Sequence, residues 1–426
     1  MNNKNKKVYI LGSARIPFVK SQTVYKDISR QTLMTTAMNH LVENFKLQNK
    51  KIDDVAFGAI MCSSADWNLS REVVLGSGLH PETPAYNVQR ACGTGLETAW
   101  QLGLKISAGH IDTAIAGGVD TNSDLPIEVS DNLKKMLLKL NVSKTFGQKL
   151  STLSSFRPSF LVPKLPAVIE PRTKMSMGEH TELMVKEWKI TREEQDELAL
   201  ASHKNGAKAY ADGFYNDLVF AMGDIKTDQT LRGDTTLEKL AKLKPAFDTS
   251  AAGTLTAGNS SPLTDGAAAV FLASEEASQK LGKMPLAQLV DVQVAAVDFV
   301  QGAGLLMAPT IAVSKLLQRN NLTFADFDYI EIHEAFAGQV LCNMKAWESA
   351  DYCKNILGLK APLGKINRER LNSAGSSLAL GHPFAATGAR LVGTLAKHLS
   401  SGGKKRGLIS ICTAGGMGIA AIMETA

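Results

Sequence analysis

Long apolar runs are missing from this 426-residue chain. Its apolar segments, such as VAFGAIMC, AAAVFLA and LISIC, are much shorter than the roughly 18 to 20 residues that a transmembrane helix needs. The basic amino terminus runs directly into a strand-like segment, without the apolar stretch and small-residue cleavage site of a signal peptide. The sequence therefore predicts a protein that neither crosses a membrane nor is exported.

Cysteine is scarce as well, and strong net charge is absent. The chain has five cysteines in no CxxC spacing, so the sequence indicates neither a disulfide framework nor a zinc site. We therefore expect no bound metal and a reducing, cytoplasmic location. The net charge of +6 is mild for this length, which suits a polyanionic small molecule better than nucleic acid.

The sequence does contain a clear α/β alternation. Short β-branched runs near residues 8, 55 and 113 alternate with helix-like stretches such as DISRQTLMTTAMNHLVENF. The segment 121–250 departs from this pattern with its prolines, a basic stretch and a helical run from Gly178 to Gly213. We interpret it as an inserted region that covers a ligand, with the same alternation resuming after it.

The two flanking parts resemble each other. Residues 91–118 and 382–416 both follow the pattern of a helix, a glycine stop, a strand and a double glycine. Any helix followed by a strand can produce this pattern, but an internal duplication explains it better. The predicted domains are therefore 1–120 with 251–282, the insertion 121–250, and 283–426.

Cys92 is the first candidate catalytic residue. It is followed by GTG and then by a segment with apolar residues at helical spacing, which places it near the start of a helix. The helix dipole and free backbone N–H groups at that position stabilise a thiolate, so we expect a lowered thiol pKa. Taken alone, the local sequence of Cys92 favours the other interpretation, a small buried apolar residue.

Three further residues accompany it. His382 lies in a Gly-His-Pro loop among small residues, where an imidazole can activate a thiol. Cys412 ends an apolar strand at a glycine-rich turn, where a thiol can protonate a carbon acid. His333 follows a strand, with Glu334 expected to open a helix, and such a turn offers oxyanion donors. Each residue has a purely structural alternative.

Together, the cysteine segment NVQRACGTG, the HEAF turn, the Gly-His-Pro loop and the terminal cysteine before glycines resemble the thiolase family in their order. The segments around MGEHTELMVKEW and GTLTAGNSSPLTDGAAA are similar to that family too. The resemblance implies the thiolase fold, an α/β fold with duplicated halves in a five-layered α-β-α-β-α core and an inserted loop domain.

The resemblance also implies a role for each residue. Cys92 would attack the keto carbon of a 3-ketoacyl-CoA, His382 would activate it, and Cys412 would protonate the leaving acetyl-CoA carbanion. His333 and His382 would form one oxyanion hole, and the backbone N–H groups of Cys92 and Ala414 the other. Ala414 stands where family members commonly have glycine. The implied CoA and substrate contacts are Met177, Ala257, Ser261, Ala335 and Phe336.

His333 occupies a position where many thiolases have asparagine, and HEAF is similar to the thiolase subunit of fatty-acid β-oxidation complexes. The resemblance thus favours cleavage of 3-ketoacyl-CoA over the alternative, synthesis of acetoacetyl-CoA. CoA is then a co-substrate, and no permanently bound cofactor is expected. A β-ketoacyl synthase would lack Cys412, and a non-catalytic acyl-CoA binder would not need the intact set of Cys92, His382 and Cys412.

The basic segment 131–166 is a candidate for contact with a partner. Residues 131–166 carry seven Lys or Arg against one Asp, with KKMLLKL placing lysines among leucines. This pattern fits a membrane surface, an acidic partner, CoA phosphates or a solvated helix face. The resemblance implies a homodimer or dimer of dimers, and a complex with a hydratase and 3-hydroxyacyl-CoA dehydrogenase subunit.

Overall fold

The computed structural model describes residues 6–401 and 403–426. Residues 1–5, which carry part of the basic amino terminus, lie outside the described residues. The strands are β1 (Val8–Arg15), β2 (Val19–Lys20), β3 (Asp54–Phe57), β4 (Ala85–Asn87), β5 (Thr113–Asp120), β6 (Thr264–Ala273), β7 (Ala287–Ala296), β8 (Tyr329–Ile332), β9 (Arg406–Thr413) and β10 (Met417–Glu424).

The helices alternate with these strands, apart from a run of helices between β5 and β6. They are α1 (Arg30–Asn44), α2 (Leu69–Leu75), α3 (Thr94–Ser107), α4 (Asp131–Val142), α5 (Phe146–Leu153), α6 (Met177–Glu187), α7 (Arg192–Ala211), α8 (Leu237–Ala241), α9 (Glu275–Lys280), α10 (Ala308–Asn320), α11 (Ala337–Glu348), α12 (Ala350–Asn355), α13 (Ser377–Leu380) and α14 (Ala386–Ser400).

The strand order is β4-β3-β5-β6-β1-β7-β10-β9-β8, with β2 paired to β6. Strands β1 and β7 meet at the centre through three antiparallel residue pairs, Val8–Leu289, Tyr9–Gln288 and Ile10–Ala287. From this seam outwards, the strands of the amino-terminal half are β1, β6, β5, β3 and β4. Without β2, these are the first, fifth, fourth, second and third strands of that half along the chain. The carboxyl-terminal side repeats it, with β7, β10, β9 and β8 equivalent to β1, β6, β5 and β3.

This repeat confirms the predicted duplication. Helix α3 precedes β5 as α14 precedes β9, and α1 and α10 connect equivalent strand pairs. The counterpart of β4 is reduced to a single parallel bridge between Ile330 and Leu371. The two sequence segments with similar patterns therefore occupy equivalent places in the two halves.

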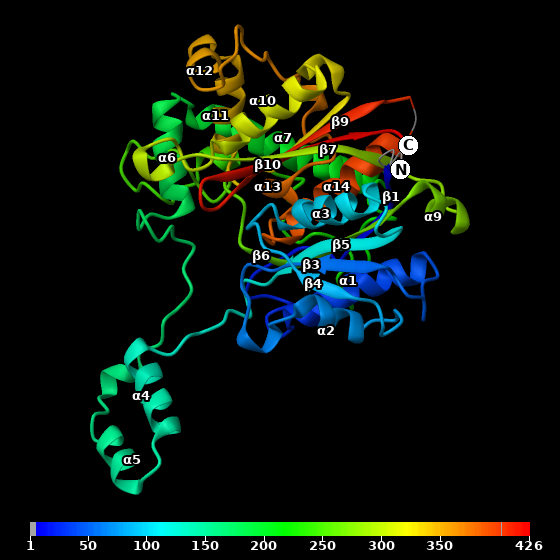
Figure 1. The fold of residues 1–426 in the computed structure, drawn as a ribbon. Helices are drawn as coiled ribbons and strands as arrows, with labels where there is room; N and C mark the ends of the chain where they lie inside the picture. The colour runs from blue at the N-terminus through cyan, green and yellow to red at the C-terminus, as the bar shows by residue number, and fades with distance from the viewer. Residues whose placement is uncertain (1–5, 402) are drawn as a thin grey trace.

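The helices and strands form five layers (Figure 1), and the three larger hydrophobic cores of the described residues lie between them. One core lies between α1, α2 and the sheet of β1, β3, β5 and β6, and a second lies around α3 and α14 between the two halves. The third packs α6, α7, α10 and α11 against β8, β9 and β10. All ten residues of β6 are buried, as expected for a strand covered on both faces. The predicted α-β-α-β-α architecture is confirmed.

Helices α3 and α14 approach each other backbone to backbone at the centre of the molecule. A Cβ atom on Gly95 would lie 2.4 Å from the backbone nitrogen of Ala389, and one on Gly388 would lie 2.3 Å from that of Leu96. The N–H of Gly95 donates to the carbonyl of Ala385 at 3.0 Å. Both helix starts therefore lie side by side.

The helices α4 and α5 form an arm that projects far from the layered body (Figure 1). Each helix begins with a side-chain cap, Ser130 for α4 and a capping box of Thr145 and Gln148 for α5. Among the described residues, no helix is long and apolar enough to cross a membrane.

Two local expectations are wrong. The helical run expected from Gly178 to Gly213 is two helices, because Thr191 caps a new helix with Glu194 after a turn at Lys189. Glu334 does not open a helix. It is drawn into buried hydrogen bonds with Ser202 and Asn372 instead, and α11 begins at Ala337.

We predict that Gly95→Ala destabilises the protein by about 1–3 kcal/mol, because the added methyl group meets backbone atoms that cannot move aside. Gly103→Ala, in the same helix, is the matched control, since its Cβ would meet side-chain atoms and no backbone, those of Val8 at 3.3 Å and of Leu289 at 3.6 Å. Chemical denaturation measures both. Equal unfolding free energies for the two variants would contradict the tight contact of α3 and α14.

Candidate active site

Cys92 lies in the turn that leads into α3. Ala91 before it has φ of 43°, a left-handed conformation that is costly for a residue with a side chain, and Gly93 after it caps the helix. The strained turn places the thiol two residues before the helix, where the backbone N–H groups of Ala414 and Cys92 act on it. The predicted position near a helix start is confirmed.

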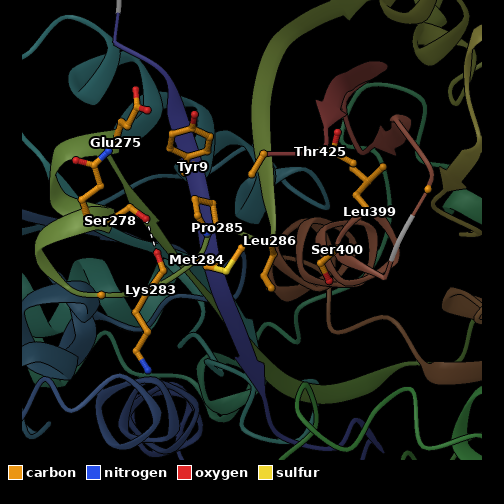
Figure 2. A pocket seen from close by; sticks show the side chains of 14 residues that line it. Tyr9, Glu275, Ser278, Lys283, Met284, Pro285, Leu286, Leu399, Ser400 and Thr425 are labelled. Carbon is orange, nitrogen blue, oxygen red and sulfur yellow. Dashed lines mark hydrogen bonds between the residues drawn. The ribbon is translucent and has the colours of Figure 1, made fainter.

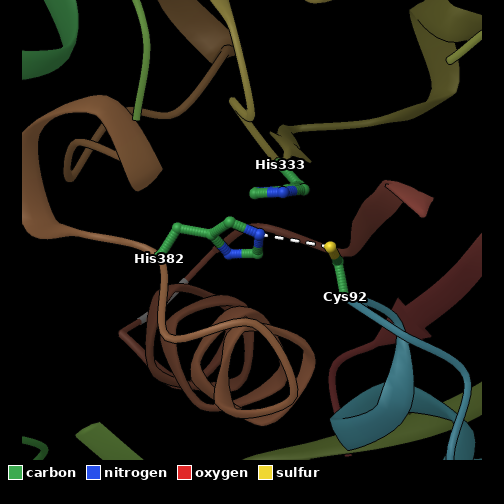
Figure 3. Close-up of side chains that lie close together, drawn as sticks. All are labelled: Cys92, His333 and His382. Carbon is green, nitrogen blue, oxygen red and sulfur yellow. Dashed lines mark hydrogen bonds between the residues drawn. The ribbon is translucent and has the colours of Figure 1, made fainter. Parts of the chain in front are cut away.

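His382 comes from the loop before α14. Gly381, with φ of 99°, turns the chain, and the backbone N–H of His382 donates to Thr264 Oγ1 at 2.8 Å. The imidazole Nε2 lies 3.2 Å from Cys92 Sγ (Figure 3), and Nδ1 lies 2.6 Å from Thr387 Oγ1. The structure therefore joins two residues 290 positions apart in a nucleophile and base pair.

His333 lies directly beside this pair. Its ring centroid is 4.0 Å from that of His382 (Figure 3), and its Nδ1 is 2.7 Å from Ser377 Oγ. Its Nε2 is buried and has no hydrogen-bond partner in the described part of the chain. A buried polar atom without a partner is unusual, and this one is available for a substrate oxygen.

Cys412 is the penultimate residue of β9, before the turn Ala414-Gly415-Gly416. Its side chain is 1% exposed, and the neighbouring Cys92 contributes to raising the pKa of its thiol. The structure therefore brings Cys92, His382, His333 and Cys412 together, although they come from four segments of the chain.

Burial determines the charge state of these groups. It raises the pKa of Cys92 to about 12, although the N–H groups of Ala414 and Cys92 lower it. Burial lowers the pKa of His382 to about 3, with Arg390 adding to the effect. The expected low thiol pKa is wrong, because desolvation of a fully buried anion outweighs the helix start. The resting pair is a thiol and a neutral imidazole.

The pair opens into a cavity of about 200 Å³ with a mainly apolar lining. The lining residues are Ile60, Met61, Cys92, Ala167, Val168, Ile169, Glu170, Met177, Ser261, Leu263, Ala335, Phe336, His382, Phe384 and Ala414. Glu170 ties the covering segment to the β9–β10 turn by accepting the N–H of Gly415 at 2.8 Å.

Most of the predicted contact residues lie in this lining. Met177, Ser261, Ala335 and Phe336 border the cavity, and the N–H of Ser261 donates to the carbonyl of Ala335 at 2.9 Å. Ala257 lies on an exposed turn outside the lining. The role of residues 167–170 in covering the cavity was not predicted, because nothing in their composition distinguishes them from an ordinary loop.

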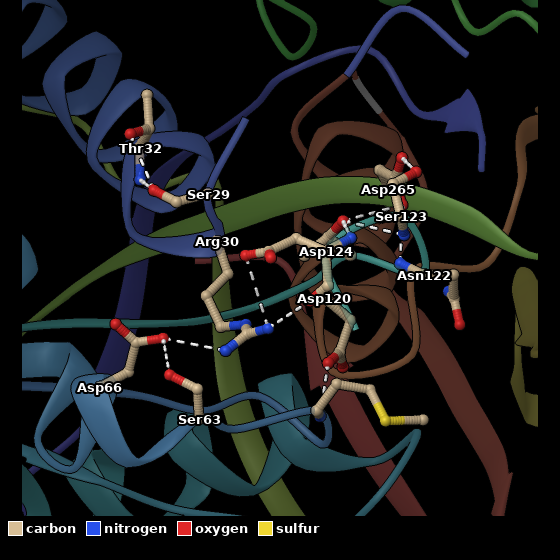
Figure 4. A network of polar contacts seen from close by, with 12 residues as sticks. Ser29, Arg30, Thr32, Ser63, Asp66, Asp120, Asn122, Ser123, Asp124 and Asp265 are labelled. Carbon is tan, nitrogen blue, oxygen red and sulfur yellow. Dashed lines mark hydrogen bonds and ion pairs between the residues drawn. The ribbon is translucent and has the colours of Figure 1, made fainter. Parts of the chain in front are cut away.

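Asp120, at the end of β5, was also missed. Figure 4 shows Asp120 within a network of polar contacts. Its carboxylate accepts the N–H groups of Ile60 at 2.9 Å, Met61 at 3.0 Å and Ala385 at 2.9 Å. Burial raises its pKa to about 7. One side chain thus holds both a wall of the cavity and the start of α14. An aspartate after a strand was the available signal, but its partners are distant in sequence.

A larger hollow of about 620 Å³ lies elsewhere, where Tyr9, Lys283 and Leu399 meet near the carboxyl terminus (Figure 2). It contains none of the four reactive side chains. The smaller cavity at Cys92 is therefore the candidate active site.

The donor atoms of Cys92, His333 and His382 also have the geometry of a cation site. One ligand atom of each lies within 4.8 Å of the others, and a thiolate with two imidazoles matches what Zn²⁺ accepts. The same three groups are required for acyl transfer in the arrangement described above. The expectation of no bound metal stays a prediction.

Comparisons with known proteins agree with this arrangement. The family model for the thiolase N-terminal domain matches residues 8–276, and the model for the thiolase C-terminal domain matches residues 283–425. A 3-ketoacyl-CoA thiolase of Shewanella sp. (strain W3-18-1) is 38% identical over 99% of this chain and 98% of its own length. The mitochondrial trifunctional enzyme subunit beta of Bos taurus is 40% identical over 98% of this chain and 88% of its own.

Two solved structures are also similar. The acetyl-CoA acetyltransferase of Bacillus anthracis superposes with a TM-score of 0.83 at 29% identity, covering both chains completely. The human mitochondrial 3-ketoacyl-CoA thiolase in complex with CoA gives 0.80 at 28% identity, covering 99% of this chain and 98% of that one.

We predict that alkylation of Cys92 by iodoacetamide accelerates about 100-fold from pH 7 to pH 9, because only the thiolate reacts and burial holds the thiol pKa near 12. Mass spectrometry of the Cys92 peptide measures the rate, and Cys92→Ala identifies the signal. A rate that is constant from about pH 6 upward would instead reveal a thiolate–imidazolium pair, in contradiction to the structure.

Proposed function

The chain belongs to the thiolase family, and from this we propose that its cavity cleaves 3-ketoacyl-CoA with CoA to give acetyl-CoA and a shortened acyl-CoA. The observation that carries the proposal is the contact between Cys92 Sγ and His382 Nε2 at the base of a covered, apolar cavity. A thiol and a base in contact can form an acyl-enzyme, and the apolar walls suit an acyl chain.

In the first step, Cys92 Sγ attacks carbon 3 of the substrate while its proton passes to His382 Nε2. The carbonyl oxygen becomes an oxyanion, which the N–H groups of Cys92 and Ala414 stabilise. Support for this hole comes from the same two N–H groups, which already lower the pKa of the Cys92 thiol. The methyl group of Ala414 thus leaves its N–H directed at the sulfur.

In the second step, the bond between carbons 2 and 3 breaks and the acyl group stays on Cys92. The electron pair moves to an enolate of acetyl-CoA, whose thioester oxygen accepts hydrogen bonds from His333 and from the protonated His382. Cys412 then donates its proton to carbon 2. The high thiol pKa of Cys412 matches this role, because a weak acid protonates a carbanion without ionising at rest.

In the third step, CoA enters and gives its thiol proton to the Cys412 thiolate. Its sulfur attacks the acyl-cysteine, Cys92 leaves as a thiolate, and His382 returns the proton to it. Every group is then in its starting state. CoA acts as a co-substrate, and the reaction needs no permanently bound cofactor.

The direction of the reaction is the point at which two family activities compete. Acetoacetyl-CoA synthesis gains support from the similar Bacillus anthracis structure. The full-length relatives at 38% and 40% identity, however, are a 3-ketoacyl-CoA thiolase and a trifunctional enzyme subunit. His333 stands where many thiolases have asparagine, and HEAF is similar to the thiolase subunit of fatty-acid β-oxidation complexes. We therefore favour cleavage in fatty-acid β-oxidation, at a cytoplasmic location.

Two exposed features support a proposal for the oligomeric state. Strand β4 ends the strand order, and Trp67 near it is 86% exposed. Because a bare sheet edge next to an aromatic side chain is normally covered, we propose a homodimer through this edge. The similarity to a trifunctional enzyme subunit supports a complex with a hydratase and 3-hydroxyacyl-CoA dehydrogenase subunit.

We further propose that 121–250 is the inserted domain covering the CoA site, and that its arm touches an anionic membrane surface. Val142 and Phe146, at the tip between α4 and α5, are 73% and 81% exposed. The seven cations of residues 131–166 lie on the same arm. Apolar side chains among lysines, on helices remote from the body, are typical of an interfacial segment.

The proposed activity is tested by mixing the protein with acetoacetyl-CoA or 3-ketopalmitoyl-CoA and following loss of the ketoacyl thioester. We expect cleavage only when CoA is present, and faster cleavage of the longer substrate. Cys92→Ser should lower the rate about 10³-fold or more. Cys342→Ser, another buried cysteine in α11, is the control and should retain activity. No CoA-dependent cleavage of either substrate would refute the proposal.

The membrane contact is tested by sedimentation with vesicles of phosphatidylserine and phosphatidylcholine. Each cation near an anionic surface contributes about 1 kcal/mol, so reversing the seven charges of the arm should weaken partitioning at least 10-fold, by a rough count. Thiolase activity should remain, because α4 and α5 do not line the cavity. Equal binding of both proteins would end this proposal.

A further inference from the structure

Each of the two active-site histidines contacts a hydroxyl group, and these two hydroxyl groups have different partners. In the described structure, Thr387 Oγ1 has His382 Nδ1 as its one side-chain partner. Ser377 Oγ contacts His333 Nδ1 at 2.7 Å and also accepts a hydrogen bond from Arg390 Nη2 at 2.8 Å. The difference is therefore a buried guanidinium behind one of the two hydroxyl groups.

This guanidinium fixes the direction of the hydrogen bonds. Arginine only donates, so the oxygen of Ser377 is an acceptor towards Arg390. If the second lone pair of that oxygen accepted an Nδ1–H of His333, the hydroxyl hydrogen would be buried without an acceptor among the described residues. Donation from the hydroxyl to Nδ1 of His333 satisfies both groups. A ring nitrogen that accepts a hydrogen bond carries no proton, so the proton of a neutral His333 is on Nε2.

We propose that Arg390, acting through Ser377, is a positioning residue that holds His333 in the tautomer with its proton on Nε2. His333 is then a hydrogen-bond donor towards the substrate thioester oxygen. His382 takes the opposite tautomer, since Thr387 is free to accept its Nδ1–H and its Nε2 must be a lone pair facing Cys92 Sγ. Two adjacent imidazoles thus become a donor and a base.

Burial and an open partner position agree with this assignment. His333 is 0% exposed, and its Nε2 has no partner among the described residues, as expected for a donor waiting for a ligand. Burial, with His382 and Arg390 adding to it, lowers the pKa of His333 well below its usual value, so the ring stays neutral and has two tautomers to choose between. Burial lowers the pKa of Arg390, and Glu331 and Glu334 act against this lowering.

The neighbouring Ser376 provides an internal comparison. Its hydroxyl also accepts from Arg390, at 3.3 Å, and donates to the carbonyl of Ile332 at 3.2 Å. A carbonyl only accepts, so the hydroxyl of Ser376 passes its hydrogen on in the same direction. Ser376 is equally buried but does not touch His333.

The inference rests on the proposed thiolase function, and its test separates the two. Protein labelled with ¹⁵N-histidine is studied by long-range ¹H–¹⁵N correlation, with His333→Asn identifying the His333 signals. The wild-type enzyme should show the Nε2–H tautomer of His333. Ser377→Ala should shift His333 towards Nδ1–H and lower kcat for 3-ketoacyl-CoA cleavage about 100-fold, with KM little changed.

Two control measurements make this test specific to Ser377. Ser376→Ala should keep the Nε2–H tautomer and most of kcat. Exchange of labelled CoA into an acyl-CoA, which needs the acyl-cysteine but no enolate, should continue in Ser377→Ala. An Nδ1–H tautomer in the wild-type enzyme, or equal effects of Ser376→Ala and Ser377→Ala, would overturn the inference. Absence of exchange in the wild-type enzyme would refute the thiolase function and leave the tautomer result standing.

Discussion

The close contact of α3 and α14 through Gly95 and Gly388 is the constraint on which the active site depends. Cys92 lies immediately before one helix and His382 before the other, so the distance between sulfur and imidazole follows from how near the two helix starts can come. Side chains at either glycine would force the backbones apart. Asp120 reinforces the same contact by holding the N–H of Ala385.

Burial at this contact has a chemical consequence. Cys92 and His382 are both buried, which raises the pKa of the thiol to about 12 and lowers that of the imidazole to about 3, so both groups are neutral at rest. In a low-dielectric site, fixed donors stabilise a developing oxyanion more strongly than they would in water. The thiol of Cys92 is therefore not ionised at rest and becomes a thiolate only when an acyl group is present.

Local patterns in the sequence were sufficient for much of the fold. The apolar face of Leu33, Ala37 and Leu41 defines α1, and the cysteine before a double glycine marks the end of β9. The family resemblance added the grouping of the four reactive residues. Effects that depend on contacts between distant segments could not be predicted from the sequence. The burial that raises the Cys92 pKa and the contact of Ser377 with both Arg390 and His333 link segments with no shared local signal.

The three-residue seam between β1 and β7 has an evolutionary consequence. Because the two halves meet through equivalent strands running antiparallel, they are related by an approximate twofold axis, as the subunits of a symmetric dimer would be. Cys92 and His382 precede equivalent helices in the two halves. An ancestral dimer of one half would have presented two identical helix starts at its axis. In this chain the two starts differ, since one carries the thiol of Cys92 and the other the imidazole of His382.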